Sequence, residues 1–186
     1  AGRFGQCGVF SFYPTKQITT GEGGIVISDD FQFIEEVKRL RAFGIDSSPQ
    51  DRTIPGQYDV KALGYNYRMT DFQAALGVGQ LERYTVNLSP RRRNAMVYSE
   101  LLKSQDLLTV PDFIEHSSYF IYPVLLNQQT DRDRVSKVLK EKGIGTSVHY
   151  AKAISEMSYY CQREISTELF GATSYARRNI SLPVYG

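Results

Sequence analysis

The sequence predicts an α/β fold, because strand-like and helix-like segments alternate along the chain. Two short apolar runs rich in β-branched and aromatic residues, 8–12 and 24–28, are typical of strands. Residues 31–43 follow with apolar side chains at helical spacing. Further along, the pattern predicts a strand, a helix and a second strand at 119–126, 131–142 and 145–150. This order favours sheets covered by helices, in two successive parts.

The composition is that of an ordinary globular protein. Of the 186 residues, 41% are hydrophobic and 23% are charged, which argues against disorder. The net charge of +2 comes from 22 basic and 20 acidic residues spread along the chain. No apolar run approaches the roughly 20 residues that span a bilayer. We therefore expect a soluble protein with neither nucleic acid nor a membrane as its partner.

Cysteine and histidine usage gives no sign of a disulfide framework or a metal site. Cys7 and Cys161 lie far apart, and His116 and His149 fall at no metal-ligand spacing with them. We therefore expect no bound metal and a reducing compartment, the cytoplasm.

A polar loop that contains Lys16 connects the first two expected strands. The helix at 31–43 should end at Gly44, a natural C-terminal stop. Residues 45–62 contain two prolines and show no hydrophobic period, which predicts a long connecting loop. Loops of that length are commonly functional.

Two helices are expected in the middle of the chain. Over residues 70–84, Thr70 and Gln73 form a capping-box pattern ahead of an apolar stripe. Ser89 and Pro90 then predict a new N-cap, followed by proline at the first position of a second helix.

We expect two domains, 1–86 and 87–186, divided at the break between these helices near residues 85–89. In the second domain, residues 152–178 look mostly helical, and 180–185 read as the start of another strand. The chain begins and ends abruptly at strand-like segments. We therefore expect sequence to be missing at both ends.

Three consecutive arginines fall in the first turn of the expected second helix. The helix dipole disfavours cations there by a few tenths to about 1 kcal/mol. A diphosphate or an acidic neighbour would compensate Arg91, Arg92 and Arg93. A solvated helix surface is the alternative.

Several segments indicate chemistry when they are taken together. Lys16 alone would be read as a solvated surface charge. The segments are SFYPTK (11–16), TTGEGG (19–24), GYNYRMTDFQAA (64–75), KGIGT (142–146) followed by His149 and Tyr150, and SLP (181–183). Over nearly the whole chain they resemble the DegT/StrS family of sugar aminotransferases, which belongs to the fold-type I pyridoxal-phosphate enzymes.

The resemblance implies the C-terminal half of such an enzyme: the end of a large cofactor-binding domain and a small α/β domain. It implies that Lys16 is catalytic, carries pyridoxal 5'-phosphate as a Schiff base and acts as general acid/base. A free amine can add to an aldehyde and move a proton, whereas an ammonium cannot. The reaction would transfer an amino group, from glutamate, to the keto carbon of a nucleotide-linked deoxysugar.

Two other functions stay open. Sugar dehydratases of the same family characteristically have histidine in place of the lysine, so Lys16 counts against that reaction. A regulatory or binding protein would keep the fold without catalysis.

The resemblance also implies roles for other residues of the first part. Ser11 would lie near the cofactor phosphate, where a hydroxyl donor is useful, and otherwise would bond to nearby backbone. Asn66 and Arg68 would reach across a homodimer interface to the partner's cofactor phosphate, so the active sites would be shared. A surface salt bridge is the alternative for Arg68. The glycines around Glu22 suit either a tight turn or a ligand.

In the second part, His149 and Tyr150 are candidates for contacts with the sugar nucleotide. A strand-end histidine satisfied by its neighbours is the alternative, and Lys152 stands where the family often has proline. The family's aspartate, stacking aromatic residue and phosphate loop would all precede Ala1. We therefore expect this segment alone to bind the cofactor poorly and to expose apolar surface.

Overall fold

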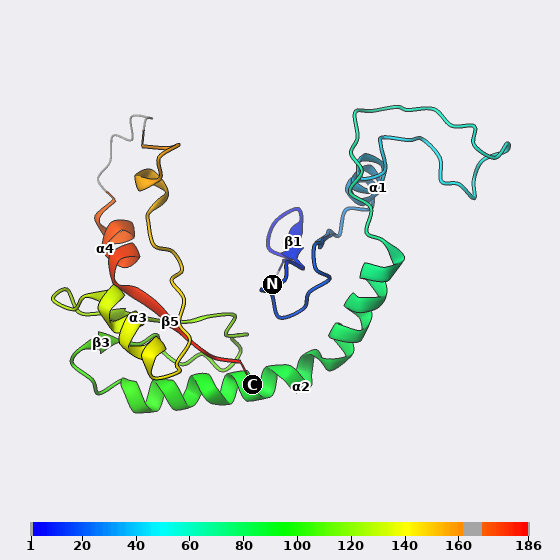
Figure 1. Ribbon diagram of the computed structural model, residues 1–186. Helices are drawn as coiled ribbons and strands as arrows, with labels where there is room; N and C mark the ends of the chain where they lie inside the picture. The colour runs from blue at the N-terminus through cyan, green and yellow to red at the C-terminus, as the bar shows by residue number, and fades with distance from the viewer. Residues whose placement is uncertain (1, 162–168, 186) are drawn as a thin grey trace. The chain divides into compact units, whose positions relative to one another are not determined.

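The structure is a computed structural model that describes residues 2–161 and 169–185 (Figure 1). The chain divides into two compact units, Ala1–Tyr84 and Thr85–Gly186. The elements are, in chain order, β1 (Gly8–Ser11), β2 (Gly24–Ile27), α1 (Phe31–Leu40), α2 (Asp71–Leu102), β3 (Leu108–Thr109), β4 (Tyr122–Leu126), α3 (Arg132–Glu141), the 3-10 helix η1 (Ile154–Glu156), α4 (Phe170–Arg178) and β5 (Asn179–Leu182). Strands and helices mix in both units, so the predicted α/β class is confirmed. No described helix is both long enough and apolar enough to cross a membrane.

In the first unit, β1 and β2 form an antiparallel two-stranded sheet. The register pairs Gly8 with Ile27 and Ser11 with Gly24. Both strands lie where the apolar runs predicted them. The chain between them, residues 12–23, is a long loop that carries Lys16.

Helix α1 begins with a side-chain cap and ends at a left-handed turn. Asp30 accepts a hydrogen bond from the backbone N–H of Phe33 at 3.1 Å. Phe43 and Gly44 adopt φ values of 66° and 70°, so the helix stops earlier than the predicted residue 43. A Cβ on Gly44 would lie 1.9 Å from the carbonyl oxygen of Ala62. Glycine is therefore required there both for the turn and for this close approach.

The predicted connecting loop at 45–62 contains no helix or strand, as expected. Two isolated bridges hold its ends together, one between Ile45 and Val60 and the other between Ala42 and Asn66. The loop therefore leaves α1 and returns beside it, directly ahead of the motif at 64–75.

The predicted break between two middle helices is wrong, because α2 runs without interruption through Pro90. Serine followed by proline looks the same at a helix start as inside a helix, and only contacts from elsewhere distinguish the two. Arg91 donates a hydrogen bond to the carbonyl of Tyr119 at 3.2 Å, and Arg92 donates to that of Ser117 at 2.9 Å. These carbonyls satisfy two arginines that lie in mid-helix, so neither a diphosphate nor an acidic neighbour is needed.

The second unit contains a three-stranded antiparallel sheet in the order β3-β4-β5. The central strand β4 pairs Tyr122 with Leu182 and Leu125 with Asn179. Helix α3 matches the predicted helix at 131–142, and β3 was not predicted.

The predicted strand at 145–150 is wrong, because only Ser147 pairs with the sheet, through a single bridge to Ser181. The backbone N–H of His149 instead donates to the side chain of Asn179 at 2.9 Å. The helix predicted over 152–178 is confirmed only where α4 forms. Residues 152–161 contain just the short 3-10 helix η1. Residues 162–168 lie outside the described part of the chain.

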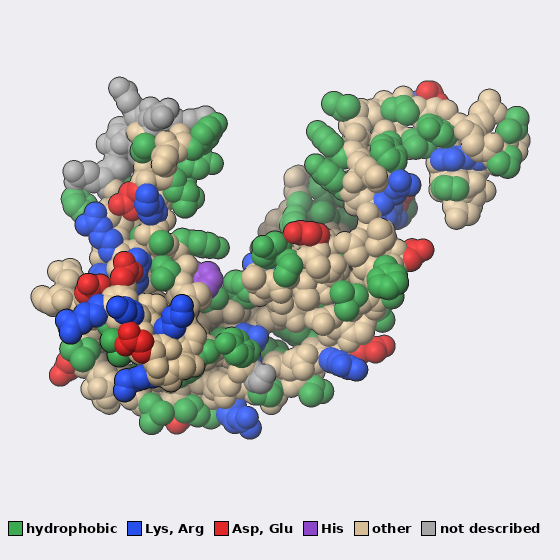
Figure 2. Space-filling model, in the orientation of Figure 1, with side chains coloured by type: hydrophobic (Ala, Val, Ile, Leu, Met, Phe, Trp, Pro, Cys, Tyr) green, Lys and Arg blue, Asp and Glu red, His purple; other side chains and the backbone are tan. Residues whose placement is uncertain are grey.

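The apolar core of the described chain lies in the second unit. Its buried hydrophobic residues are Ala95, Tyr119, Tyr122, Val124, Leu126, Ala153, Ala176, Ile180 and Val184. Among the described residues of the first unit no hydrophobic side chain is buried, and Val9, Leu63 and Phe72 are largely exposed. Figure 2 shows such apolar side chains, in green, over much of the visible surface. The expected exposure of apolar surface is therefore observed.

A buried hydroxyl pair lies inside this core. The Tyr122 phenol, which is 0% exposed, forms a 2.8 Å hydrogen bond with Ser99. Burial raises the pKa of the Tyr122 phenol above its ordinary value of about 10, although the hydrogen bond with Ser99 opposes that shift. The phenol therefore stays neutral in the folded unit at a pH where the unfolded chain ionises.

We predict that the second unit loses stability at alkaline pH through this phenol. A raised folded-state pKa contributes stability that is complete below about pH 10 and falls as the pH rises through the folded-state value. Urea unfolding as a function of pH should show this loss, and Tyr122→Phe should reduce its slope. Tyr159→Phe makes the same change at a side chain that is 70% exposed, so its free energy of unfolding should fall with pH as steeply as that of the wild type. An unchanged slope in Tyr122→Phe would assign the loss to other groups.

Candidate active site

Lys16 lies in a tight turn near the start of the loop between β1 and β2. Its backbone N–H donates to the carbonyl of Tyr13 at 2.9 Å, which closes a four-residue turn. Pro14 occupies the second position of this turn, where its fixed φ is favourable. The lysine side chain is half-buried. A local backbone turn therefore holds this residue.

Backbone and hydroxyl contacts close the base of this lysine loop, residues 12–23. The N–H of Phe12 donates to the carbonyl of Gly23 at 2.9 Å, which extends the pairing of β1 with β2 by one step. The carbonyl of Phe12 accepts from the N–H of Thr20 at 3.1 Å and from the hydroxyl of Thr19 at 3.0 Å. Thr20 is only 3% exposed, and its hydroxyl donates to the carbonyl of Glu22 at 2.8 Å. The loop is thus a folded structure with a defined base.

The lysine loop is tied to the start of α2 by one glutamine. The side-chain amide of Gln73 donates to the carbonyl of Glu22 at 2.8 Å. The side-chain oxygen of Gln73 accepts from the N–H and hydroxyl of Thr70 at 3.1 and 3.0 Å, and the Thr70 hydroxyl accepts from the N–H of Gln73 at 3.3 Å. The predicted capping box is present, and its glutamine also joins two motifs that lie 51 residues apart. Local sequence could predict the cap but not this second contact.

The glycines around Glu22 belong to a turn packed against its own chain. Gly21 and Gly23 have φ values of 79° and 150°. A Cβ on Gly23 would lie 2.5 Å from the Thr20 hydroxyl and 2.9 Å from the methyl group of Met69. Of the two explanations for these glycines, the structure supports the tight turn.

Ser11 lies at the end of β1, just ahead of the lysine turn. Its side-chain oxygen accepts a hydrogen bond from the N–H of Tyr13 at 3.2 Å, and the side chain is exposed. The hydroxyl hydrogen is not used in that contact, so Ser11 can still donate to a ligand. Both expectations for this serine, a backbone bond and a free donor, are therefore compatible.

Asn66 and Arg68 lie together on the segment that leads into α2. The guanidinium of Arg68 donates to the side-chain oxygen of Asn66 at 3.2 Å and lies 4.9 Å from the ring centre of Phe43. The N–H of Tyr67 donates to the carbonyl of Arg41 at 2.9 Å, which holds this segment beside the end of α1. Both side chains are exposed, and the ion pairs seen among the described residues do not include Arg68. The salt-bridge alternative is not supported.

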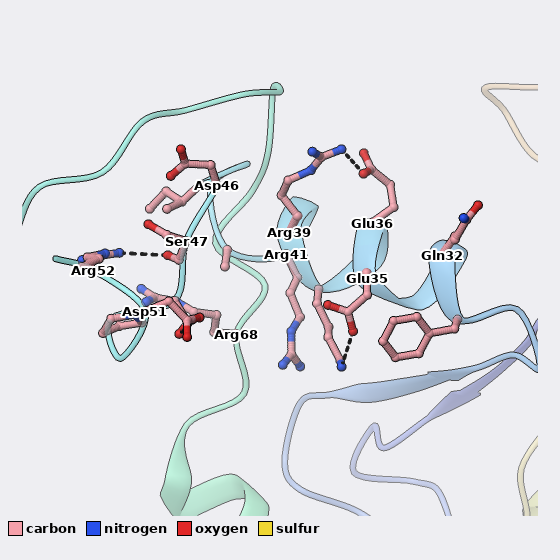
Figure 3. Close-up of a pocket in the computed structure, with 16 residues that line it drawn as sticks. Gln32, Glu35, Glu36, Arg39, Arg41, Asp46, Ser47, Asp51, Arg52 and Arg68 are labelled. Atoms are coloured by element: carbon pink, nitrogen blue, oxygen red, sulfur yellow. Dashed lines mark hydrogen bonds and ion pairs between the residues drawn. The ribbon is translucent and has the colours of Figure 1, made fainter.

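A cavity of about 770 Å³ lies between α1 and residues 45–52, with Arg68 on its wall (Figure 3). Charges of both signs line it, and two cations are already paired with carboxylates of α1. The pairs are Lys38 with Glu35 and Arg39 with Glu36. Of the candidate residues in the first unit, only Arg68 lines this cavity. It is therefore distinct from the lysine loop.

A second cavity, of about 600 Å³, lies beside the base of the lysine loop. Residues 22–26, Met69 and Gln73 contribute to its wall. Arg41 and Arg68 line both cavities. Arg41 carries no motif and no local signal, so sequence reasoning could not single it out.

His149 and Tyr150 lie in the second unit. Nδ1 of His149 lies 3.0 Å from the hydroxyl oxygen of Ser181 and 3.4 Å from that of Ser147. Tyr150 is 69% exposed. The histidine is therefore satisfied by neighbours at one ring nitrogen, as the alternative expected, while the tyrosine extends into solvent.

The model of the DegT/DnrJ/EryC1/StrS aminotransferase family matches residues 1–186. The chain belongs to this family. Uncharacterized protein MJ1066 of Methanocaldococcus jannaschii is 34% identical over an alignment of 193 positions that covers 99% of this chain and 50% of that protein. The UDP-4-amino-4,6-dideoxy-N-acetyl-beta-L-altrosamine transaminase of Campylobacter jejuni is 32% identical over an alignment of 189 positions that covers 99% of this chain and 48% of that protein.

The fold resembles solved sugar aminotransferases. Helicobacter pylori PseC, an aminotransferase involved in the biosynthesis of pseudoaminic acid, superposes with a TM-score of 0.87 at 31% identity. That match covers 100% of this chain and 49% of PseC. The chain thus spans about half the length of the relatives it matches.

The side chains of the first unit fit pyridoxal phosphate, the cofactor of this family. The cofactor needs an amine for its aldehyde and hydrogen-bond donors for its phosphate. Lys16 supplies an amine on a folded loop, Ser11 keeps a free hydroxyl hydrogen, and Arg68 carries a guanidinium without an ion pair among the described residues. The donor set is therefore appropriate.

We predict that Gly23→Ala disrupts the base of the lysine loop. The added Cβ meets Thr20 and Met69, and the φ of 150° is one that alanine rarely adopts, so a loss of about 1–3 kcal/mol is expected. Urea unfolding would measure it. Gly79→Ala is the matched control, because a Cβ there meets nothing within 4 Å and alanine favours a helix by up to about 1 kcal/mol. Equal stability of Gly23→Ala and wild type would contradict the packing described.

Proposed function

We propose that this protein is a pyridoxal-phosphate-dependent aminotransferase that moves an amino group, from glutamate, to the keto carbon of a nucleotide-linked deoxysugar. The observation that carries the proposal is the contact between the two family motifs, in which Gln73 holds the lysine loop through the carbonyl of Glu22. The family match over residues 1–186 supports amino transfer. The UDP-sugar transaminase name of the Campylobacter jejuni relative supports the substrate class.

Lys16 has two tasks in this proposal. Its amine would hold the cofactor, and the same amine, once free, would take up and release the proton that moves during the transfer. When bound, pyridoxal phosphate supplies an electron sink for the bond that breaks. The turn at Tyr13–Lys16 fixes the backbone from which the lysine side chain extends, so that both tasks are done from one position.

Ser11, Asn66 and Arg68 are assigned to the phosphate of the cofactor. The Ser11 hydroxyl would serve the cofactor of its own subunit. Asn66 and Arg68 would serve that of the partner in a homodimer, because the guanidinium fork suits a phosphate and its own chain leaves it exposed. Residues 1–86 then end the large cofactor domain, and 87–186 form the small domain, of an enzyme that acts in the cytoplasm.

The two alternatives differ from this proposal at Lys16. A dehydratase of the family would have histidine at this position, so the lysine favours amino transfer. A regulatory protein with the same fold would form no covalent bond to the cofactor. Cofactor absorbance and chemical trapping therefore separate the three functions.

We predict that borohydride reduction fixes the cofactor on Lys16 in the full-length protein. Mass spectrometry of the reduced protein should place the added mass on the peptide that contains Lys16. Lys16→Ala should remove both the trapped mass and transamination, while the unfolding transition of the cofactor-free variant should match that of the cofactor-free wild type. Lys137→Ala, at an exposed position of α3, should retain both. Turnover by Lys16→Ala, or trapping on another lysine, would refute the assignment.

Shared active sites are tested by mixing two inactive variants. If Asn66 serves the partner's cofactor, a dimer of Lys16→Ala with Asn66→Ala contains one site with both residues intact. After random mixing, about half of the dimers are mixed, and one of the two sites in each mixed dimer is intact. About a quarter of all active sites should therefore be active. Single-turnover amounts would measure this fraction. No restored activity would show that Lys16 and Asn66 act in the same subunit.

A further inference from the structure

Asn179 is a fully buried amide at the junction of α4 and β5. It is 0% exposed, follows the last residue of α4 and begins β5. Burying an amide without partners costs free energy, so its contacts indicate what it holds. Its side-chain nitrogen donates to the carbonyls of Tyr175 at 2.9 Å and of Ala176 at 3.3 Å. These carbonyls belong to the last turn of α4. The backbone N–H of Asn179 also donates to the carbonyl of Tyr175, and Arg132 donates to that of Ala176 at 2.6 Å.

The same side chain also holds the His149–Tyr150 segment. Its oxygen accepts from the N–H of His149 at 2.9 Å, and its nitrogen donates to the carbonyl of Tyr150 at 3.1 Å. A neighbouring strand would normally make such a pair of contacts, but this segment meets the sheet only through the bridge between Ser147 and Ser181. Asn179 therefore replaces the strand pairing that the segment lacks.

Ser181 holds the histidine ring in the same way that Asn179 holds the backbone. It lies two residues along β5, so both side chains project from the same face of the strand. Its hydroxyl lies 3.0 Å from Nδ1 of His149, and the serine is 3% exposed. Backbone and ring of His149 are thus both set by one strand.

This arrangement leaves two polar groups available. Within the described ranges, the hydrogen bonds of the His149 ring are made by Nδ1, to serine hydroxyls, and none involves Nε2. The ring of Tyr150 meets that of His149 edge-on at 5.8 Å between centres, and Tyr150 is 69% exposed. An imidazole nitrogen and a phenol are therefore presented together. Such a pair can hydrogen-bond to hydroxyl or diphosphate oxygens.

We propose that Asn179 and Ser181 are positioning residues that hold His149 and Tyr150 for contact with the nucleotide-sugar substrate. The proposal rests on the function proposed above, which supplies the ligand class. Neither residue is catalytic, since both act through the His149–Tyr150 segment. A loss of Ser181 frees the ring while Asn179 still holds the backbone, and a loss of Asn179 releases the backbone itself.

The test uses the holoenzyme as its gene encodes it, with UDP-N-acetylglucosamine and dTDP-glucose as binding probes in calorimetry. Ser181→Ala should weaken the binding of whichever probe the wild type binds about tenfold and raise the KM for the sugar nucleotide equally. It should leave unchanged the rate of the half-reaction with glutamate and the cofactor trapped on Lys16. Ser181→Thr, which keeps a hydroxyl, should restore affinity.

Ser99→Ala separates positioning from stability. Ser99 is also a buried serine of the second unit, but its hydroxyl bonds to Tyr122 and not to the histidine. It should lower stability and leave probe binding unchanged. Asn179→Leu should weaken probe binding more than Ser181→Ala does.

Equal probe affinity in wild type and Ser181→Ala, or failure of the wild type to bind either probe, would overturn the positioning role. Trapping on Lys16 is measured without a sugar nucleotide. A failure there would remove the proposed function, while the effect of Ser181 on probe binding could still be read.

Discussion

The carbonyl of Glu22 is the acceptor on which the first unit depends. It receives hydrogen bonds from the Thr20 hydroxyl and from the side chain of Gln73, both at 2.8 Å. One bond closes the base of the lysine loop, and the other joins that loop to α2. No hydrophobic side chain is buried among the described residues of this unit, so polar contacts of this kind connect its elements within the chain. They fix the base of the loop, while the turn at Tyr13–Lys16 holds the backbone of Lys16 itself.

The second unit is built on the opposite principle. The core between the sheet and its helices contains the almost fully buried side chains of Tyr122, Val124 and Ile180. Apolar packing therefore fixes β5, independently of its polar contacts. A fixed strand is what a positioning residue requires. Asn179 and Ser181 can therefore hold His149 from outside the regular pairing of the sheet, without a strand at 145–150.

Sequence predicted what depends on local pattern and missed what depends on distant contacts. The first two strands, α1 and the cap at Thr70 have signals within a few residues of where they form. The continuity of α2 through Pro90 is associated with carbonyls about 25 residues away, and the loss of the strand at 145–150 depends on Asn179, about 30 residues away. Lys16 was found by motif and not by geometry. The partnership of Gln73 with Glu22 and the position of Arg41 had no sequence signal at all.

The exposed apolar surface of the first unit and the chemistry of Lys16 are linked through the hairpin that carries both. Val9 and Ile25 are 71% and 46% exposed on β1 and β2, and the lysine loop continues directly from these strands. Any surface that covers the hairpin would therefore also exclude water near the loop. Burial of this hairpin and exclusion of water from the lysine loop would accordingly be one event.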